Sequence, residues 1–511
     1  MRRRDFIKTG LMVTLGGAVI PRWLQPLLAR SGELREASLG RVLVVVNMGG
    51  GNDGLNTLVP YTNDIYYNFR PNIAIPPNQV LTINNELGFH PVLDPLMNQW
   101  NEGQMAIVQD VGYPDQNLSH FRSTDIWRSA SDAEAHVDTG WVARYLETVY
   151  TDYIENPPEF PMALQQGSSD DLLLRGTEGV TGLIVDDPNT FAELVGSTYE
   201  GEYENDPPNT AGGAELSYVR QIDLNAFTYA QVIQDAAEAG SNTLEYPNTN
   251  LGFQLGSVAR LLSGGMYTPV FLVHQYGYDT HANQQADHVP LLSDLAESLG
   301  TFHNDIKNMG LEEYVITLTT SEFGRRPFEN GSLGTDHGAA APLFLIGQDV
   351  NGGIYGNNTD LENFDEDNNI LHQYDFRQIY STVLEDWFSM SPDGSENVLF
   401  QPFATLPLIN NPTTSINENG SPLPVDYSLG TPYPNPFNAV TKLKYSVKEK
   451  SPVDISVFDA LGRKVANPVR GLRNAGIYEL SLTAKNWSSG AYLVRMTAGR
   501  FTATRKINLV K

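Results

Sequence analysis

Carboxylate, imidazole and hydroxyl side chains recur in this chain near the ends of apolar segments, and together they could bind a cation and cleave an ester. Divalent cations such as zinc take oxygen and imidazole nitrogen ligands, one from each side chain. The pattern therefore predicts a site for a divalent metal ion (zinc, calcium or magnesium) with these candidate ligands: Asp53, Asp279, His281, Glu322, Asp336 and His337.

A candidate nucleophile, Ser119, stands where a helix is expected to begin. The free N–H groups of a first helical turn favour an anion, and a serine there can attack a metal-bound ester. Arg122, one turn later, or the pair Arg325–Arg326 could hold the oxygens of a phosphate or sulfate group. The alternative is that Ser119 only caps the helix and that the arginines are solvated.

Each candidate ligand also has a structural interpretation. An aspartate after a strand commonly forms a turn or caps a helix, and Asp336–His337 could be a buried hydrogen-bonded pair. A loop with Asp360, Asp365 and Asp367 could bind calcium, but we interpret it as a solvated loop.

The composition narrows the chemistry. A net charge of −27 opposes binding to a nucleic-acid backbone, and no local basic patch stands out, so no nucleic-acid partner is expected. The chain has no cysteine, which excludes disulfides, thiolate metal sites, cysteine nucleophiles and a cysteine-derived formylglycine.

The elements that would position these side chains alternate between strands and helices. Continuous apolar runs predict buried strands of a mainly parallel sheet at 42–46, 105–111, 270–274, 314–320 and 342–346. Helical spacing is found at 90–100, 119–129, 251–262 and 291–302. We therefore expect an α/β fold over residues 38–402 with helices on both faces of the sheet, and ligands at the carboxyl ends of its strands.

The C-terminal part has a different pattern. Residues 403–428 are rich in Pro, Asn, Ser and Thr, which is typical of a linker. Strict alternation over 429–511 then predicts about seven short strands in a small, immunoglobulin-like β-sandwich.

The first 30 residues have the order of an export signal. Arg2, Arg3 and Arg4 precede Phe6-Ile7-Lys8 and an apolar stretch at 11–20, which is too short to span a membrane. The motif resembles the twin-arginine consensus, which implies the twin-arginine translocase as a partner and no stable transmembrane span after processing. An ordinary signal or a short anchor is the alternative.

The sandwich also carries a resemblance. Tyr433–Asn438, Phe458–Arg463, Ser489–Tyr492 and Lys506–Lys511 resemble the C-terminal sorting domain of the type IX secretion system. The resemblance implies the type IX machinery as a partner and export through the periplasm to the cell surface or the exterior. The alternative is a carbohydrate-binding or generic immunoglobulin-like domain.

The core is similar to the bacterial family named domain of unknown function 1501, through segments 47–57, 117–121, 277–283, 321–326 and 334–338. Members resemble alkaline phosphatases and sulfatases. That resemblance implies Asp53 or Asn47 as the first ligand, Ser119 as nucleophile, Asp279, His281 and His337 at one metal, and Glu322 at another.

Two positions depart from that superfamily pattern. Asn47 stands where a metal-binding aspartate is expected, and Phe323 follows Glu322 where an Asp-His pair is common. A single-metal or vestigial site would account for both. Sulfatase chemistry is disfavoured because Phe121 and Ser123 replace residues of the sulfatase pattern.

The sequence thus favours an exported metal-dependent hydrolase of phosphate or sulfate esters, with a small molecule or a glycan as substrate. The alternative is a non-catalytic surface or glycan-binding protein on the same scaffold.

Overall fold

A computed structural model describes residues 12–15, 18–21, 40–410 and 427–510, apart from gaps at 152, 154–156, 168–170, 178, 189–190, 192–206, 209, 431, 433–434, 436, 449–450, 460–461, 474–475, 485–486 and 499–500. The chain divides into two compact units, Met1–Asn410 and Asn411–Lys511. The predicted twin-arginine motif and linker residues 411–426 lie outside the described residues. Two short strands, β1 (Met12–Leu15) and β2 (Ala18–Pro21), pair antiparallel.

The first unit is built on a nine-stranded sheet with the order β15-β7-β14-β11-β3-β10-β8-β9, and β16 also pairs with β7. The strands are β3 (Val42–Gly49), β7 (Met105–Gly112), β8 (Ala163–Gln166), β9 (Gly182–Val185), β10 (Val270–Tyr276), β11 (Val315–Thr320), β14 (Ala341–Gly347), β15 (Gly353–Tyr355) and β16 (Tyr374–Asp375). In the described part of the chain, β14 alone runs against the others. The prediction of a mainly parallel sheet is confirmed.

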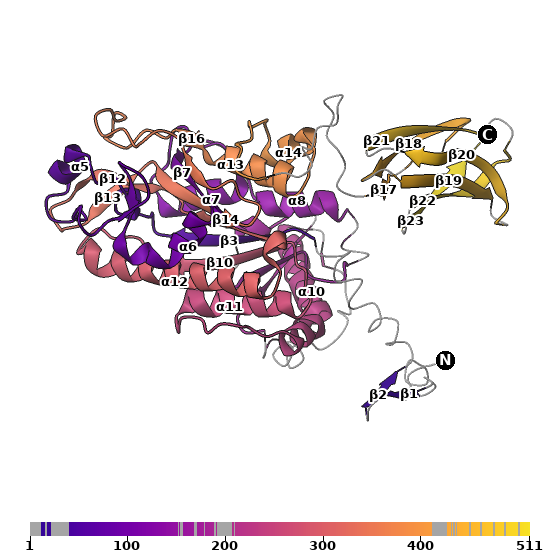
Figure 1. Ribbon diagram of the computed structural model, residues 1–511, viewed down its shortest axis with the longest axis horizontal. Coiled ribbons are helices and arrows are strands. Elements are labelled where there is room, and N and C mark those ends of the chain that lie inside the picture. The colour runs from indigo at the N-terminus through magenta and orange to yellow at the C-terminus, as the bar shows by residue number, and fades with distance from the viewer. Residues whose placement is uncertain are drawn as a thin grey trace. The chain divides into compact units, whose positions relative to one another are not determined.

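Helices cover both faces of this sheet, as expected (Figure 1). One face packs on α6 (Met97–Asn101), α10 (Ala211–Ala239), α11 (Asn250–Ser263) and α12 (Gln284–Asn308). The other packs on α7 (His120–Ser129), α8 (Trp141–Val149), α13 (Phe376–Thr382) and α14 (Pro392–Leu399). Val42, Val44 and Val46 of β3 point into the first core, while Leu43 and Val45 point into the second. Burial on both faces explains why β3 is a continuous apolar run.

Smaller elements surround the carboxyl ends of the strands. A short helix α4 (Gly54–Thr57) follows the glycine turn after β3 and is followed by a small sheet of β4 (Leu58–Val59), β6 (Gly88–Phe89) and β5 (Leu81–Thr82). Beyond these, α5 (Asp64–Phe69) lies near the hairpin of β12 (Gly324–Glu329) and β13 (Thr335–Gly338). This hairpin and the start of α7 supply much of the candidate site.

The second unit is an antiparallel β-sandwich with its own apolar core, as predicted. One sheet has the order β17-β18-β21 and the other β20-β19-β22-β23. The strands are β17 (Ser428–Leu429), β18 (Val440–Val447), β19 (Ser451–Asp459), β20 (Lys464–Arg473), β21 (Gly476–Thr483), β22 (Gly490–Ala498) and β23 (Phe501–Leu509). Among the described helices of the whole chain, none combines the length and apolar character needed to cross a membrane.

Candidate metal centre

Three separate segments bring ligand-type side chains together at the carboxyl edge of the sheet. His120 begins α7, Asp279 follows β10, and His337 lies on β13 of the hairpin. One ligand atom from each of these side chains lies within 4.8 Å of the other two, so the three could hold a metal ion.

A third imidazole, that of His281, joins this group. Its Nε2 atom lies 2.9 Å from His337 Nε2 and 3.0 Å from Asp279 Oδ1. His337 Nε2 is 3.1 Å from the same Oδ1 atom, and His120 Nε2 is 3.4 Å from Asp279 Oδ2. The Nε2 atoms of three histidines therefore surround one carboxylate.

Each of these imidazoles has a partner on its other nitrogen. His120 Nδ1 is 2.8 Å from Glu322 Oε1, His337 Nδ1 is 2.8 Å from the Leu118 carbonyl oxygen, and His281 Nδ1 is 3.4 Å from Asp336 Oδ1. A donating Nδ1–H fixes the tautomer in which Nε2 carries a free lone pair. His120 Nε2 is buried and makes no hydrogen bond to any described residue. We define these four residues, His120, Asp279, His281 and His337, as the histidine cluster.

The glycine turn after β3 supports His120 through Glu322. The Gly50 N–H donates to Glu322 Oε1 at 2.9 Å and to Oε2 at 3.2 Å. Gly50 has a φ of +125°, and a Cβ atom there would lie 2.4 Å from the Asp279 backbone nitrogen. Glycine is therefore required, both for the backbone conformation and for the close approach to the segment that carries Asp279.

Arg325 is buried and joins the three parts of the site. Its guanidinium donates to the carbonyl oxygens of Gly51 at 2.8 Å, Thr335 at 2.9 Å and Tyr278 at 3.0 Å, and to that of Gly50. It also donates to Asp279 Oδ1 at 2.8 Å.

These contacts set the charge of Asp279. Burial by itself would raise the pKa of the Asp279 carboxyl, but hydrogen bonds from Arg325 and His337 lower it to about 2. The carboxylate is therefore ionised at neutral pH.

The structure places the remaining predicted residues as follows. Glu322 and Asp336 lie behind the imidazoles rather than among the Nε2 atoms. Ser119 is exposed at the N-cap of α7, next to His120, and its side chain makes no capping hydrogen bond. Arg122 donates to the carbonyl oxygens of Asp132, Ala133 and Ala135, so its guanidinium is engaged with that loop.

Asp53, in contrast, is not brought into the histidine cluster. It is wholly buried, forms a 2.6 Å ion pair with Arg70 and accepts a hydrogen bond from Gln284. Burial opposes ionisation, but the Arg70 charge leaves the Asp53 pKa lowered. Asn47 lies 3.4 Å from His274 Nδ1 through its amide nitrogen.

The acidic loop that could bind calcium is held by its own backbone. Asp360 accepts hydrogen bonds from the amides of Glu362 and Asn363, and Asp365 accepts from those of Asp367 and Asn369. These are turn contacts that aspartates make without an ion.

Sequence reasoning passed over His120, although it follows Ser119 directly. The usable signal was the expected helix start, which places the first residues of α7 at the carboxyl edge of the sheet. Its partner Glu322 is 202 residues away, so the pairing itself has no local signature.

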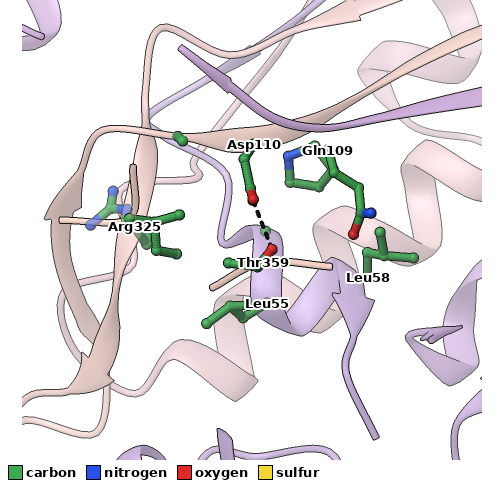
Figure 2. Close-up of a pocket in the computed structure, with 10 residues that line it drawn as sticks. Leu55, Leu58, Gln109, Asp110, Arg325 and Thr359 are labelled. Carbon is green, nitrogen blue, oxygen red and sulfur yellow. Dashed lines mark hydrogen bonds between the residues drawn. The ribbon is translucent and has the colours of Figure 1, made fainter. Parts of the chain in front are cut away.

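A small pocket is lined in part by α4 and by Arg325 (Figure 2). It is lined by Leu55, Leu58, Gln109, Asp110, Arg325 and Thr359, among others. Asp110 has a φ of +48° at a register shift of β7, and its carboxylate accepts 2.7 Å hydrogen bonds from Thr359 and Gln373. Burial raises the pKa of Asp110 to about 6.

Comparison with family models matches two parts of the chain. Residues 257–387 match the model described as a protein of unknown function (DUF1501), and residues 431–510 match that of a secretion system C-terminal sorting domain. The sorting domain indicates secretion to the cell surface or the exterior and engagement with the type IX machinery. No curated protein matches the chain.

Several solved structures show a distant likeness. Dimeric latent PorU from Porphyromonas gingivalis is 17% identical over 17% of this chain and 9% of that chain, with a TM-score of 0.14. PsFucS1 sulfatase from Pseudoalteromonas sp. is 12% identical over 91% and 88% of the two chains, with a TM-score of 0.29. TAB5 alkaline phosphatase is 12% identical over 62% and 95%, also at 0.29. This chain thus spans less than a tenth of PorU.

Proposed function

We propose that this protein is an exported, metal-dependent hydrolase of phosphate or sulfate esters. The observation that supports the proposal best is the histidine cluster, in which three imidazoles are anchored through Nδ1 and turn Nε2 toward one ionised carboxylate. We assign His120, Asp279 and His337 as the ligands, with His281 beside them, and Glu322 and Asp336 as the residues that orient two of the imidazoles.

The donor set fits a divalent ion such as zinc. Imidazole nitrogens and a carboxylate oxygen are common zinc ligands, and bonds of roughly 2.0–2.1 Å would place neighbouring ligand atoms of a tetrahedron about 3.3 Å apart. The contacts among Asp279 Oδ1, His281 Nε2 and His337 Nε2 run from 2.9 to 3.1 Å, and His120 Nε2 lies 3.4 Å from the other Asp279 oxygen, Oδ2. The buried Nε2 of His120, which makes no hydrogen bond to any described residue, would also gain a bond to the ion.

A bound divalent ion would act as a Lewis acid on an ester oxygen. The residues of the chain supply the rest of the chemistry. Ser119 presents a hydroxyl without a capping bond beside His120, in the position of the proposed nucleophile. The first amides of α7 favour a phosphate or sulfate group at this end of the helix. Arg325 keeps Asp279 ionised and in place.

The route and the substrate are proposed as well. We infer that a twin-arginine signal carries the folded protein across the inner membrane and that the sorting domain then directs it across the outer membrane. The cluster is open to solvent, with Asp279 49% exposed and His281 43% exposed, which suits an ester group on a small molecule or on a glycan.

The rival function is a non-catalytic surface or glycan-binding protein. It is favoured by Arg122, which is engaged with loop carbonyls and would have to leave them to contact an ester. Asn47, which contacts His274 where a ligand aspartate was expected, favours it too.

Metal content and hydrolysis separate the two. The purified protein should carry about one divalent ion per chain by elemental analysis, and should hydrolyse at least one of a panel of aryl phosphates, phosphodiesters and aryl sulfates. His337→Ala should lose the ion and the activity, and Ser119→Ala should keep the ion and lose the activity. His136→Ala, an exposed histidine outside the cluster, is the matched control. Absence of the ion from the wild-type protein, or equal rates in all four proteins, would refute the proposal.

A further inference from the structure

The residues of the sandwich, 429–511, differ sharply in charge from the rest of the chain. Residues 429–511 contain fourteen Lys and Arg but four Asp and Glu, a formal charge of +10, so the remainder carries −37 of the total of −27. The overall charge hides this contrast, and sequence reasoning that found no basic patch overlooked it.

Part of this positive charge gathers on one face of the sheet β20-β19-β22-β23. Alternate residues of the strands face the core, among them Val457, Val494 and Ile507. Their neighbours in sequence therefore face outward. The outward register pairs Lys464 with Phe458, Phe458 with Leu493, and Leu493 with Lys506. One row across all four strands thus has two apolar side chains between two lysines.

Arg495 extends this row. It lies two residues from Leu493 on β22, and its guanidinium is 4.8 Å from the centre of the Phe458 ring. Lys464 Nζ is 5.9 Å from the same ring. The lysines and Arg495 are exposed, and Leu493 is 44% exposed. We define Phe458, Lys464, Leu493, Arg495 and Lys506 as the basic row.

We propose that the basic row binds the anionic headgroups of a membrane surface. Lysine and arginine near such a surface are attracted to its negative potential, while apolar side chains beside them enter the headgroup boundary. The long stems of these cations can follow the apolar side chains and keep their charges at the lipid phosphates. Leu493 and Phe458 at the centre of the row favour a lipid surface over a soluble polyanion, which offers nothing apolar for them to contact.

The same charge distribution determines how far from the membrane surface this attraction can act. A chain whose remainder carries −37 is repelled by an anionic surface, but the repulsion is screened within about 8 Å at physiological salt. The basic row therefore acts locally, and it lies on the unit that indicates export to the cell surface.

The test uses the full-length protein and sedimentation with vesicles. Vesicles of phosphatidylcholine alone are compared with vesicles of phosphatidylcholine and phosphatidylglycerol at a ratio of about 3:1, at an ionic strength of about 0.15 M, where the repulsion is screened within about 8 Å. We expect binding to the anionic vesicles and none to the neutral ones, despite the net charge of −27. Each basic side chain near the surface contributes roughly fivefold in affinity, so the triple variant K464Q/R495Q/K506Q should bind on the order of 100-fold more weakly.

A matched triple variant controls for total charge. K442Q/K444Q/K448Q removes the same charge from exposed lysines on β18 and just after it, in the other sheet, and should bind within about fivefold of the wild type. Leu493→Ser, which alters no charge, should weaken binding several-fold. Thermal unfolding of each variant shows whether the sandwich is intact.

Three results would overturn the inference. One is equal weakening by the two triple variants, and another is no difference between the two kinds of vesicle. The third is binding of dextran sulfate as tightly as the anionic vesicles with no effect of Leu493→Ser, because that would make the row a site for soluble polyanions. None of these results depends on the proposed hydrolase activity.

Discussion

Replacement of Glu322 tests whether the histidine cluster is organised around an ion. Its carboxylate lies 2.8 Å from His120 Nδ1 and also accepts the Gly50 N–H. Glu322→Gln keeps an oxygen for the imidazole but removes the charge, whereas Glu322→Ala removes the acceptor and leaves the Gly50 amide without it. Loss of such a supporting partner lowers metal affinity by about 10- to 100-fold. We expect about 10-fold for Gln and about 100-fold for Ala.

The assay is competition for Zn²⁺ with a chromophoric chelator, which reads affinity without reference to any substrate. Glu329→Gln and Glu329→Ala are the matched controls, because Glu329 also accepts a backbone hydrogen bond, from Asn72 at 2.8 Å, but contacts no residue of the cluster among its described partners. Both control variants should bind zinc within about 3-fold of the wild type. If the Glu322 variants also bind zinc within about 3-fold of the wild type, Glu322 does not orient a ligand. If Glu322→Ala lost no more zinc affinity than Glu322→Gln, the negative charge of Glu322 alone would account for the loss.

Three further predictions follow from individual contacts. Asp53→Asn leaves Arg70 buried without its charged partner, and should lower the free energy of unfolding by about 3–5 kcal/mol in denaturant titrations. The zinc affinity of this variant should be unchanged, and a drop of more than about tenfold would instead make Asp53 the ligand that the sequence suggested. Gly50→Ala places a Cβ atom 2.4 Å from the Asp279 nitrogen, and should therefore weaken zinc binding by at least as much as Glu322→Gln, with refolded secondary structure checked by circular dichroism. For Asp110, burial raises the pKa from 3.8 to about 6, so the stability that the protonated carboxyl provides is present below pH 4 and is lost as the pH rises through 6. The free energy of unfolding of Asp110→Asn should therefore equal that of the wild type near pH 4 and exceed it by about 3 kcal/mol at pH 8. A difference that stays constant across this pH range would contradict the assignment.

The fold could be predicted further than the site. Val42–Val46 and the other buried runs reveal themselves because a strand covered on both faces is apolar throughout. The apolar run does not show whether a strand is parallel or antiparallel, since the sequence of antiparallel β14 is as apolar as those of its parallel neighbours. Short strands such as β8, with Gln165 and Gln166 among four residues, lack that signature.

The candidate site was predicted only in part. The local sequence indicates which residues lie at the edge of the sheet, but it does not indicate which way their side chains point. Asp279, His281 and His337 were expected at that edge, and the structure brings them together. Asp53 was expected there too, yet its carboxylate points toward Arg70. Arg70 reaches Asp53 because of the path of α5, and the sequence of the glycine turn around Asp53 gives no sign of this pairing. His120 needed the opposite inference, from a helix start to Glu322, which lies between β11 and β12, 202 residues away.

The contacts that build the cluster span much of the chain, and this determines what an ion would do. The pair His120–Glu322 closes 202 residues and the pair Leu118–His337 closes 219. An ion bound by His120, Asp279 and His337 would therefore cross-link α7, the segment after β10 and the hairpin β12–β13. Binding to the folded state alone stabilises it by about 2.7 kcal/mol at a hundredfold excess over Kd. Since the sandwich has its own core, the gain in hydrogen-exchange protection on adding zinc should concentrate in residues 118–123 and 335–338 and leave 440–509 unchanged.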